Sequence, residues 1–179
     1  MKNASNVDVD LLRLRSICLF KMGDIENSVK HLAQAMRSDP DNTSTRTIYR
    51  QMKEVNEKKT SGDGSFKEKN YQKAIDNYSA CIELSKASQA FSSKVHLNRA
   101  TAYTKLENFP ASVKDATVAI AYNPDYLKAY LRRAESYMSI GEPESIQKGI
   151  EDFEKAAEME TEEEGLKEIK TKIKKVCVA

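Results

Sequence analysis

Four segments of the chain repeat one pattern of small and bulky side chains. Each segment has a small residue, an apolar or aromatic residue four positions later, and a second small residue three positions after that. The four triplets are Ser28, Leu32 and Ala35; Ala74, Tyr78 and Cys81; Ser112, Ala116 and Ala119; and Gly149, Phe153 and Ala156. Steps of four and three keep all three side chains on one face of an α-helix. The pattern therefore predicts four helices that each pack closely against a neighbour.

A second helix is predicted before each of these four. The segments are 9–22, 55–69, 93–106 and 127–140. At the break within each pair stands a residue that tolerates a left-handed turn: Gly23, Asn70, Asn108 and Gly141. Pro40 and Pro124 each follow the second helix of a pair, where proline prevents the helix from continuing. The chain is thus predicted to be all-α and built from helix–turn–helix pairs.

The spacing of the pairs resembles that of a known repeat. The middle residues of the triplets lie 46, 38 and 37 residues apart. A period of about 34 residues with short insertions is typical of the tetratricopeptide repeat (TPR), which forms a right-handed solenoid. The insertions are expected at 43–54, near 86–92 and near 142–146. The predicted units are repeats at 9–42, 55–88, 93–126 and 127–161, a connecting helix at 43–58 and a capping helix at 162–179.

The capping helix is predicted from an apolar stripe near the end of the chain. Leu166, Ile169, Ile173 and Val176 share one helical face, and most of the nearby lysines lie off it. A solenoid needs such a helix to cover its last repeat. The alternatives are a basic tail for nucleic acid or anionic lipid, or a targeting signal.

Composition narrows the class of protein. The 29 Lys and Arg residues nearly balance the 27 Asp and Glu residues, so a nucleic-acid binder is not expected. The sequence contains no run of about 18 apolar residues, so no membrane span is expected. Its first ten residues lack the apolar core of a signal peptide, so secretion is not expected. Cys18, Cys81 and Cys177 are expected to be reduced thiols of a cytoplasmic protein. His31 and His96 are the chain's two histidines, too few for most metal and general-base sites, so no metal or cofactor is expected. No phosphate loop, nucleophile elbow or metal-ligand pair is found, so no enzymatic activity is expected. The chain is also predicted to be a monomer.

The candidate functional residues are polar side chains on the first helix of three successive pairs. They are Lys59 and Asp63, then Asn98, then Lys128 and Arg132. The first helices of a TPR stack line its concave surface, so these side chains are expected to converge there. Cations and an amide in one socket suit a ligand rich in carboxylates.

The five positions resemble the carboxylate clamp of TPR co-chaperones. The family pattern is Lys-x-x-x-Asn, then Asn, then Lys-x-x-x-Arg, and it holds the C-terminal Glu-Glu-Val-Asp tail of heat-shock protein 70 and heat-shock protein 90. The resemblance implies that Lys59 and Asn98 hold the terminal carboxylate of the tail. It also implies that Lys128 and Arg132 hold the aspartate side chain and groups upstream. Segments 96–106 and 126–138 are similar to TPR-containing J-proteins.

Two features depart from that resemblance. Position 63 is Asp, which cannot donate an amide hydrogen bond and which can neutralise Lys59 four residues earlier. Weaker binding or another ligand preference is therefore expected. The His-Pro-Asp motif of a J domain is absent, which implies a fragment or a short paralogue. The alternative function is a TPR scaffold for another protein surface, with a decayed clamp whose charged residues are merely solvated.

Overall fold

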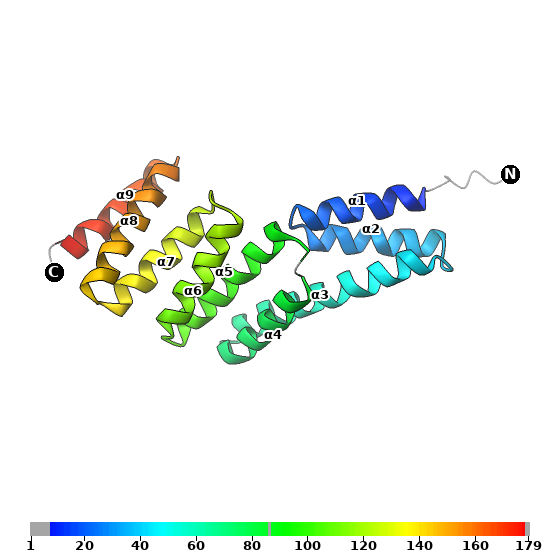
Figure 1. Cartoon of the computed structure of the whole chain (residues 1–179), viewed down its shortest axis with the longest axis horizontal. Helices are drawn as coiled ribbons and strands as arrows, with labels where there is room; N and C mark the ends of the chain where they lie inside the picture. The colour runs from blue at the N-terminus through cyan, green and yellow to red at the C-terminus, as the bar shows by residue number, and fades with distance from the viewer. Residues whose placement is uncertain (1–7, 86, 178–179) are drawn as a thin grey trace.

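The computed structural model describes residues 8–85 and 87–177, and side chains as far as residue 174. That part of the chain contains nine α-helices and no strand, which confirms the predicted fold class. The helices are α1 Val9–Lys21, α2 Ile25–Ser38, α3 Thr43–Lys67, α4 Tyr71–Leu84, α5 Gln89–Lys105, α6 Phe109–Tyr122, α7 Leu127–Ile140, α8 Pro143–Met159 and α9 Glu163–Cys177. They stack into an elongated molecule with α1 and α9 toward opposite ends (Figure 1).

The small-and-bulky faces form the core of the stack. All twelve residues of the four triplets are buried. Two of the small residues extend contacts between helices, because the Ser16 and Ser28 hydroxyls lie 2.9 Å apart and the Ser112 and Ser136 hydroxyls lie 2.8 Å apart. The predicted close packing is therefore made by serine pairs as well as by alanine and glycine.

The turns between paired helices differ in part from the expectation. Gly23 and Gly141 have the expected left-handed backbone, with φ of 82° and 76°. Asn70 and Asn108 do not, and each instead caps a helix by accepting a hydrogen bond from the backbone N–H three residues on. The left-handed residues in those two turns are the preceding ones, Lys69 and Glu107. The prediction for the two asparagines was wrong because asparagine favours both roles.

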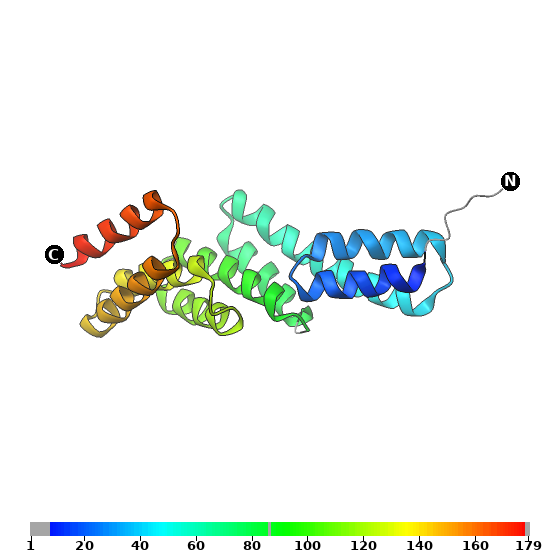
Figure 2. The same cartoon turned by 90° about the horizontal axis from the view of Figure 1, so that it is seen from above.

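The long helix α3 joins the first pair to the second without a break (Figure 2). Its two glycines, Gly62 and Gly64, lie inside the helix, where glycine is normally unfavourable. A Cβ at Gly62 would lie 2.5 Å from the ring of the buried Tyr78, whereas a Cβ at Gly64 would meet nothing within 4 Å. Gly62 therefore permits the close approach of α4.

These two glycines are expected to respond oppositely to alanine. At Gly62 the collision with Tyr78 should outweigh the gain in helix propensity and lower the free energy of unfolding by about 1–2 kcal/mol. At Gly64 the gain stands alone and should raise it by up to about 1 kcal/mol. Urea denaturation of the two variants measures the difference. Equal shifts in the same direction would contradict the packing described here.

The expected insertion near 86–92 lengthens a helix. Helix α5 begins at Gln89, after Ser88 caps it by accepting from the Phe91 N–H. The Ser88 hydroxyl also donates to the Phe20 carbonyl at 2.8 Å, and the rings of Phe20 and Phe91 lie 5.7 Å apart. The additional helical turn thus braces the first pair against α5, which is not its neighbour in sequence.

Buried ion pairs connect the later helices. Arg99 donates to the Asp115 carboxylate at 2.7 and 2.8 Å, and Arg133 donates to Asp152 at 2.8 and 2.7 Å. His96 Nδ1 lies 3.0 Å from Asp115 as well. Burial of Asp115 opposes its ionisation, but the hydrogen bonds from Arg99 and His96 outweigh burial and lower its pKa. Each pair fixes the first helix of a hairpin to the second.

Helix α9 covers the last pair, as the apolar stripe predicts. Ile169 is 3% exposed and packs with Phe153 and Ala156, and Ile173 is partly buried against the same cluster. Val176, the last member of the predicted stripe, lies outside the residues whose side chains the structure describes.

Candidate functional site

Three contiguous cavities follow the helices that carry the predicted site residues. The first, of about 300 Å³, is lined by Lys59 and Asn98 among others. The second, of about 250 Å³, is lined by Asp63 and Asn98. The third, of about 370 Å³, is lined by Asn98, Lys128 and Arg132. Because Asn98 borders all three, the cavities adjoin one another along α5, and we call them together the α5 trough.

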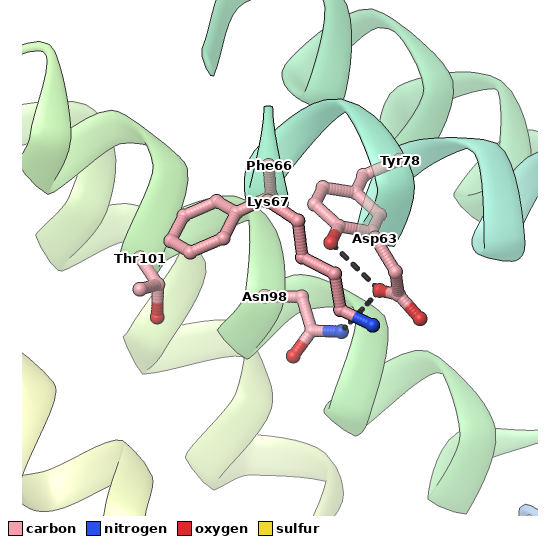
Figure 3. A pocket seen from close by; sticks show the side chains of 6 residues that line it. All are labelled: Asp63, Phe66, Lys67, Tyr78, Asn98 and Thr101. Atoms are coloured by element: carbon pink, nitrogen blue, oxygen red, sulfur yellow. Dashed lines mark hydrogen bonds between the residues drawn. The ribbon is translucent and has the colours of Figure 1, made fainter. Parts of the chain in front are cut away.

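Asp63 lies at one end of this trough, where the Tyr78 hydroxyl and the Asn98 amide point to its carboxylate (Figure 3). Its Oδ2 lies 2.9 Å from Lys59 Nζ. Its Oδ1 accepts hydrogen bonds from the Tyr78 hydroxyl at 2.8 Å and from Asn98 Nδ2 at 3.3 Å. The two side chains expected to hold a ligand carboxylate, Lys59 and Asn98, therefore already contact a carboxylate of the protein.

The core beneath Asp63 keeps its own polar groups neutral. Burial of Tyr78, together with the hydrogen bond from its hydroxyl to Asp63, raises the pKa of that hydroxyl. Burial also raises the pKa of the Cys81 thiol to about 12. Both groups are protonated at neutral pH, so Tyr78 acts as a hydrogen-bond donor that positions Asp63.

The other end of the trough carries two cations in different states. Lys128 is exposed and forms no ion pair with the described residues. Arg132 Nη1 donates to Glu135 Oε2 at 3.0 Å, while its Nε is shielded from solvent and has no hydrogen-bond partner in the described part of the chain. This end can therefore offer an ammonium group and a guanidinium donor to an anionic ligand.

Comparisons with known proteins agree with this architecture. The Tetratricopeptide repeat model matches residues 14–42. Human DnaJ homolog subfamily C member 7 is 31% identical over 159 residues, which are 89% of this chain and 32% of the relative. The second TPR domain of Spaghetti (RPAP3), solved with the HSP90 peptide SRMEEVD, is 30% identical; the match covers 62% of this chain and 97% of that domain, with a TM-score of 0.55. The chain belongs to the tetratricopeptide-repeat family.

The TPR fold extends over nearly all of the chain. The TPR domain of P58(IPK) matches 98% of it with a TM-score of 0.80, at 19% identity and over 47% of that protein, which supports the fold alone. The chain spans about a third of the length of human DnaJ homolog subfamily C member 7. The resemblance to TPR-containing J-proteins is confirmed for the TPR region.

Sequence reasoning missed several residues of the α5 trough. Lys94 lies 35 residues after Lys59 and 34 residues before Lys128, the same place in the TPR register. It lines the same cavity as Lys59 and donates to the Gly23 carbonyl at 3.2 Å. The register of the repeats was the signal that could have revealed it. Tyr78 and Glu135 were missed because their contacts with Asp63 and Arg132 depend on how the helices pack.

None of the helices in 8–85 and 87–177 has the length and apolar character needed to cross a membrane. Across the same residues, no group of three or more His, Cys, Asp and Glu side chains is arranged to hold a metal ion.

Proposed function

We propose that this TPR chain is a co-chaperone-type adaptor that docks the acidic C-terminal Glu-Glu-Val-Asp tail of heat-shock protein 90 or heat-shock protein 70 in the α5 trough. The observation that carries the proposal is the position of Asn98, which joins the cavity of Lys59 to the cavity of Lys128 and Arg132. The second TPR domain of Spaghetti (RPAP3), to which this chain is similar, was solved with a peptide that ends in the same four residues.

The chemistry of the trough suits each part of such a tail. Lys59 and Asn98 would hold the terminal carboxylate, and Lys128 and Arg132 would hold the aspartate side chain and upstream acidic groups. Phe66 and Thr101 line the cavity that Asp63 and Asn98 border, and they can accept the apolar side chain of the valine. Hydrogen bonds to charged groups contribute about 1.5–3 kcal/mol each, so a few of them are enough for micromolar affinity.

Calorimetric titration with a peptide that ends in Glu-Glu-Val-Asp tests the proposal. We expect a dissociation constant in the micromolar range, which corresponds to a binding free energy of about −8 kcal/mol. Binding should weaken as salt screens the ion pairs. The same peptide with an amidated C-terminus should bind at least about tenfold more weakly, since it lacks the terminal charge. No heat and no chemical-shift change with either peptide at millimolar concentration would reject this function.

One observation favours a second candidate, a TPR scaffold for another protein surface. Asp63 already neutralises Lys59 and engages Asn98, as a decayed clamp would. Titration of an Asp63→Asn variant separates the two candidates. A working clamp should bind the tail several-fold more tightly when this carboxylate is removed, whereas a scaffold with another ligand should bind it no better.

The same function implies an oligomeric state and a location in the cell. We infer that the chain is a monomeric binding module without catalysis of its own, and that it acts in the cytoplasm with those chaperones.

A further inference from the structure

Glu135 connects the α5 trough to helix α9. On α7, its Oε2 accepts from Arg132 at 3.0 Å. Its Oε1 lies 2.9 Å from Nζ of Lys172, which is on α9 and 37 residues away in sequence. The carboxylate is thus shared between a cation of the trough and a cation of the capping helix.

This sharing affects how much positive charge the trough presents. Glu135 lines the same cavity as Lys128 and Arg132, so its charge opposes an acidic ligand. The Lys172 ammonium group offsets that charge at Oε1, the carboxylate oxygen that Arg132 does not bind. The side chains of Arg132, Glu135 and Lys172 are 28%, 35% and 33% exposed, so water screens the interaction partly and the effect is moderate.

We propose that Lys172 is a positioning residue for the acidic tail, acting through Glu135 on Arg132. By holding one oxygen of Glu135, it prevents that carboxylate from forming a second, parallel hydrogen bond with the guanidinium group. Arg132 then keeps the N–H groups of its terminal nitrogens, apart from the Nη1 hydrogen bond to Glu135, for a ligand carboxylate. The inference rests on the proposed tail docking, and it adds α9 to the elements that determine the affinity.

The structure separates this role from a general charge effect. Lys170 is two residues away on α9 and exposed, and it forms no ion pair within the described residues. Replacing Lys170 removes the same charge from the same helix without changing the pairing of Glu135. Lys172 also lies 3.2 Å from Glu168, a contact within α9 that does not involve the trough.

Four variants of the full chain test the proposal by titration with the Glu-Glu-Val-Asp peptide. Lys172→Met should weaken binding about two- to five-fold, and Lys170→Met should leave it within experimental error. Glu135→Gln should tighten binding by a similar factor. Lys172→Met introduced into Glu135→Gln should have no further effect, because the carboxylate that Lys172 restrains is then absent.

The outcomes distinguish the inference from the function on which it rests. If the wild type binds the tail but Lys172→Met and Lys170→Met behave alike, the role of Lys172 is wrong and the function stands. If Lys172→Met weakens binding equally in the Glu135→Gln background, Lys172 acts directly on the ligand and the route through Glu135 is wrong. If the wild type does not bind the tail, both fail. A Lys172→Arg variant with restored affinity, and circular dichroism unchanged in all variants, would show that α9 remains folded.

Discussion

Replacing Asp115 with alanine is expected to lower the free energy of unfolding by about 3–5 kcal/mol. The carboxylate is 4% exposed and accepts two hydrogen bonds from Arg99 and one contact from His96. Removing it leaves the half-buried Arg99 guanidinium, within the described part of the chain, with the hydrogen bond to the Ser79 hydroxyl at 2.8 Å and the electrostatic attraction of Glu83. An uncompensated buried charge is costly, which is why the loss exceeds that of an ordinary surface change.

The matched control is Asp76 on α4, which is exposed and accepts from the side chain of Gln72. Asp76→Ala should change the free energy of unfolding by less than about 0.5 kcal/mol. Urea denaturation monitored by circular dichroism compares the two variants. Similar small losses in both would mean that the Arg99–Asp115 pair does not hold α5 against α6.

The same pair gives a dependence on pH. The pKa of Asp115 is lowered in the folded state, so its contribution to stability is present above the ordinary carboxyl pKa of about 4. It is lost as the pH falls through the lowered value. We therefore expect the stability gap between the wild type and Asp115→Ala to be constant near neutral pH and to close below about pH 4. A gap that stayed constant down to pH 2 would contradict this.

Replacing Arg132 with alanine is expected to weaken tail binding about tenfold or more. Arg132 supplies the guanidinium group at one end of the α5 trough, and a hydrogen bond to a charged group contributes about 1.5–3 kcal/mol. Its loss also leaves the carboxylate of Glu135 in the trough without its arginine partner. Both effects act in the same direction, so this should be among the most damaging single changes for binding.

Arg37 provides the control for that prediction. It is an exposed arginine near the end of α2, outside the three cavities that form the trough. Arg37→Ala removes the same charge and should leave the dissociation constant within about twofold. Isothermal titration of the two variants would contradict the account if both bound the tail equally well.

Much of the fold could be predicted because helical periodicity is a local property of the sequence. The triplets identified the buried faces, and Pro40 and Pro124 do stand just beyond α2 and α6. The turn at Asn108 was harder, because the left-handed conformation is adopted by Glu107, a residue that rarely takes it. The context of the preceding helix, and not the type of residue, decides which one turns.

The candidate site was less accessible to sequence reasoning. The register of the repeats could select Asp63, Asn98 and Arg132, since they lie 35 and 34 residues apart and so at one position of successive repeats. It could not reveal that the Tyr78 hydroxyl positions Asp63, because Tyr78 also satisfies the apolar pattern of its triplet. Nor could it reveal that Glu135 is shared with Lys172, because that contact requires α9 to be docked.

The central claim is that one trough, with Asn98 at its middle, receives an anionic chain end. Titration of ¹⁵N-labelled protein with the Glu-Glu-Val-Asp peptide, followed at the side-chain amides, tests it most directly. The Asn98 amide resonances should move and saturate, while those of Asn77, whose amide donates to the Lys73 carbonyl on α4, should stay unchanged. A stationary Asn98 resonance while signals elsewhere in the chain move would place the ligand outside the trough and contradict the account.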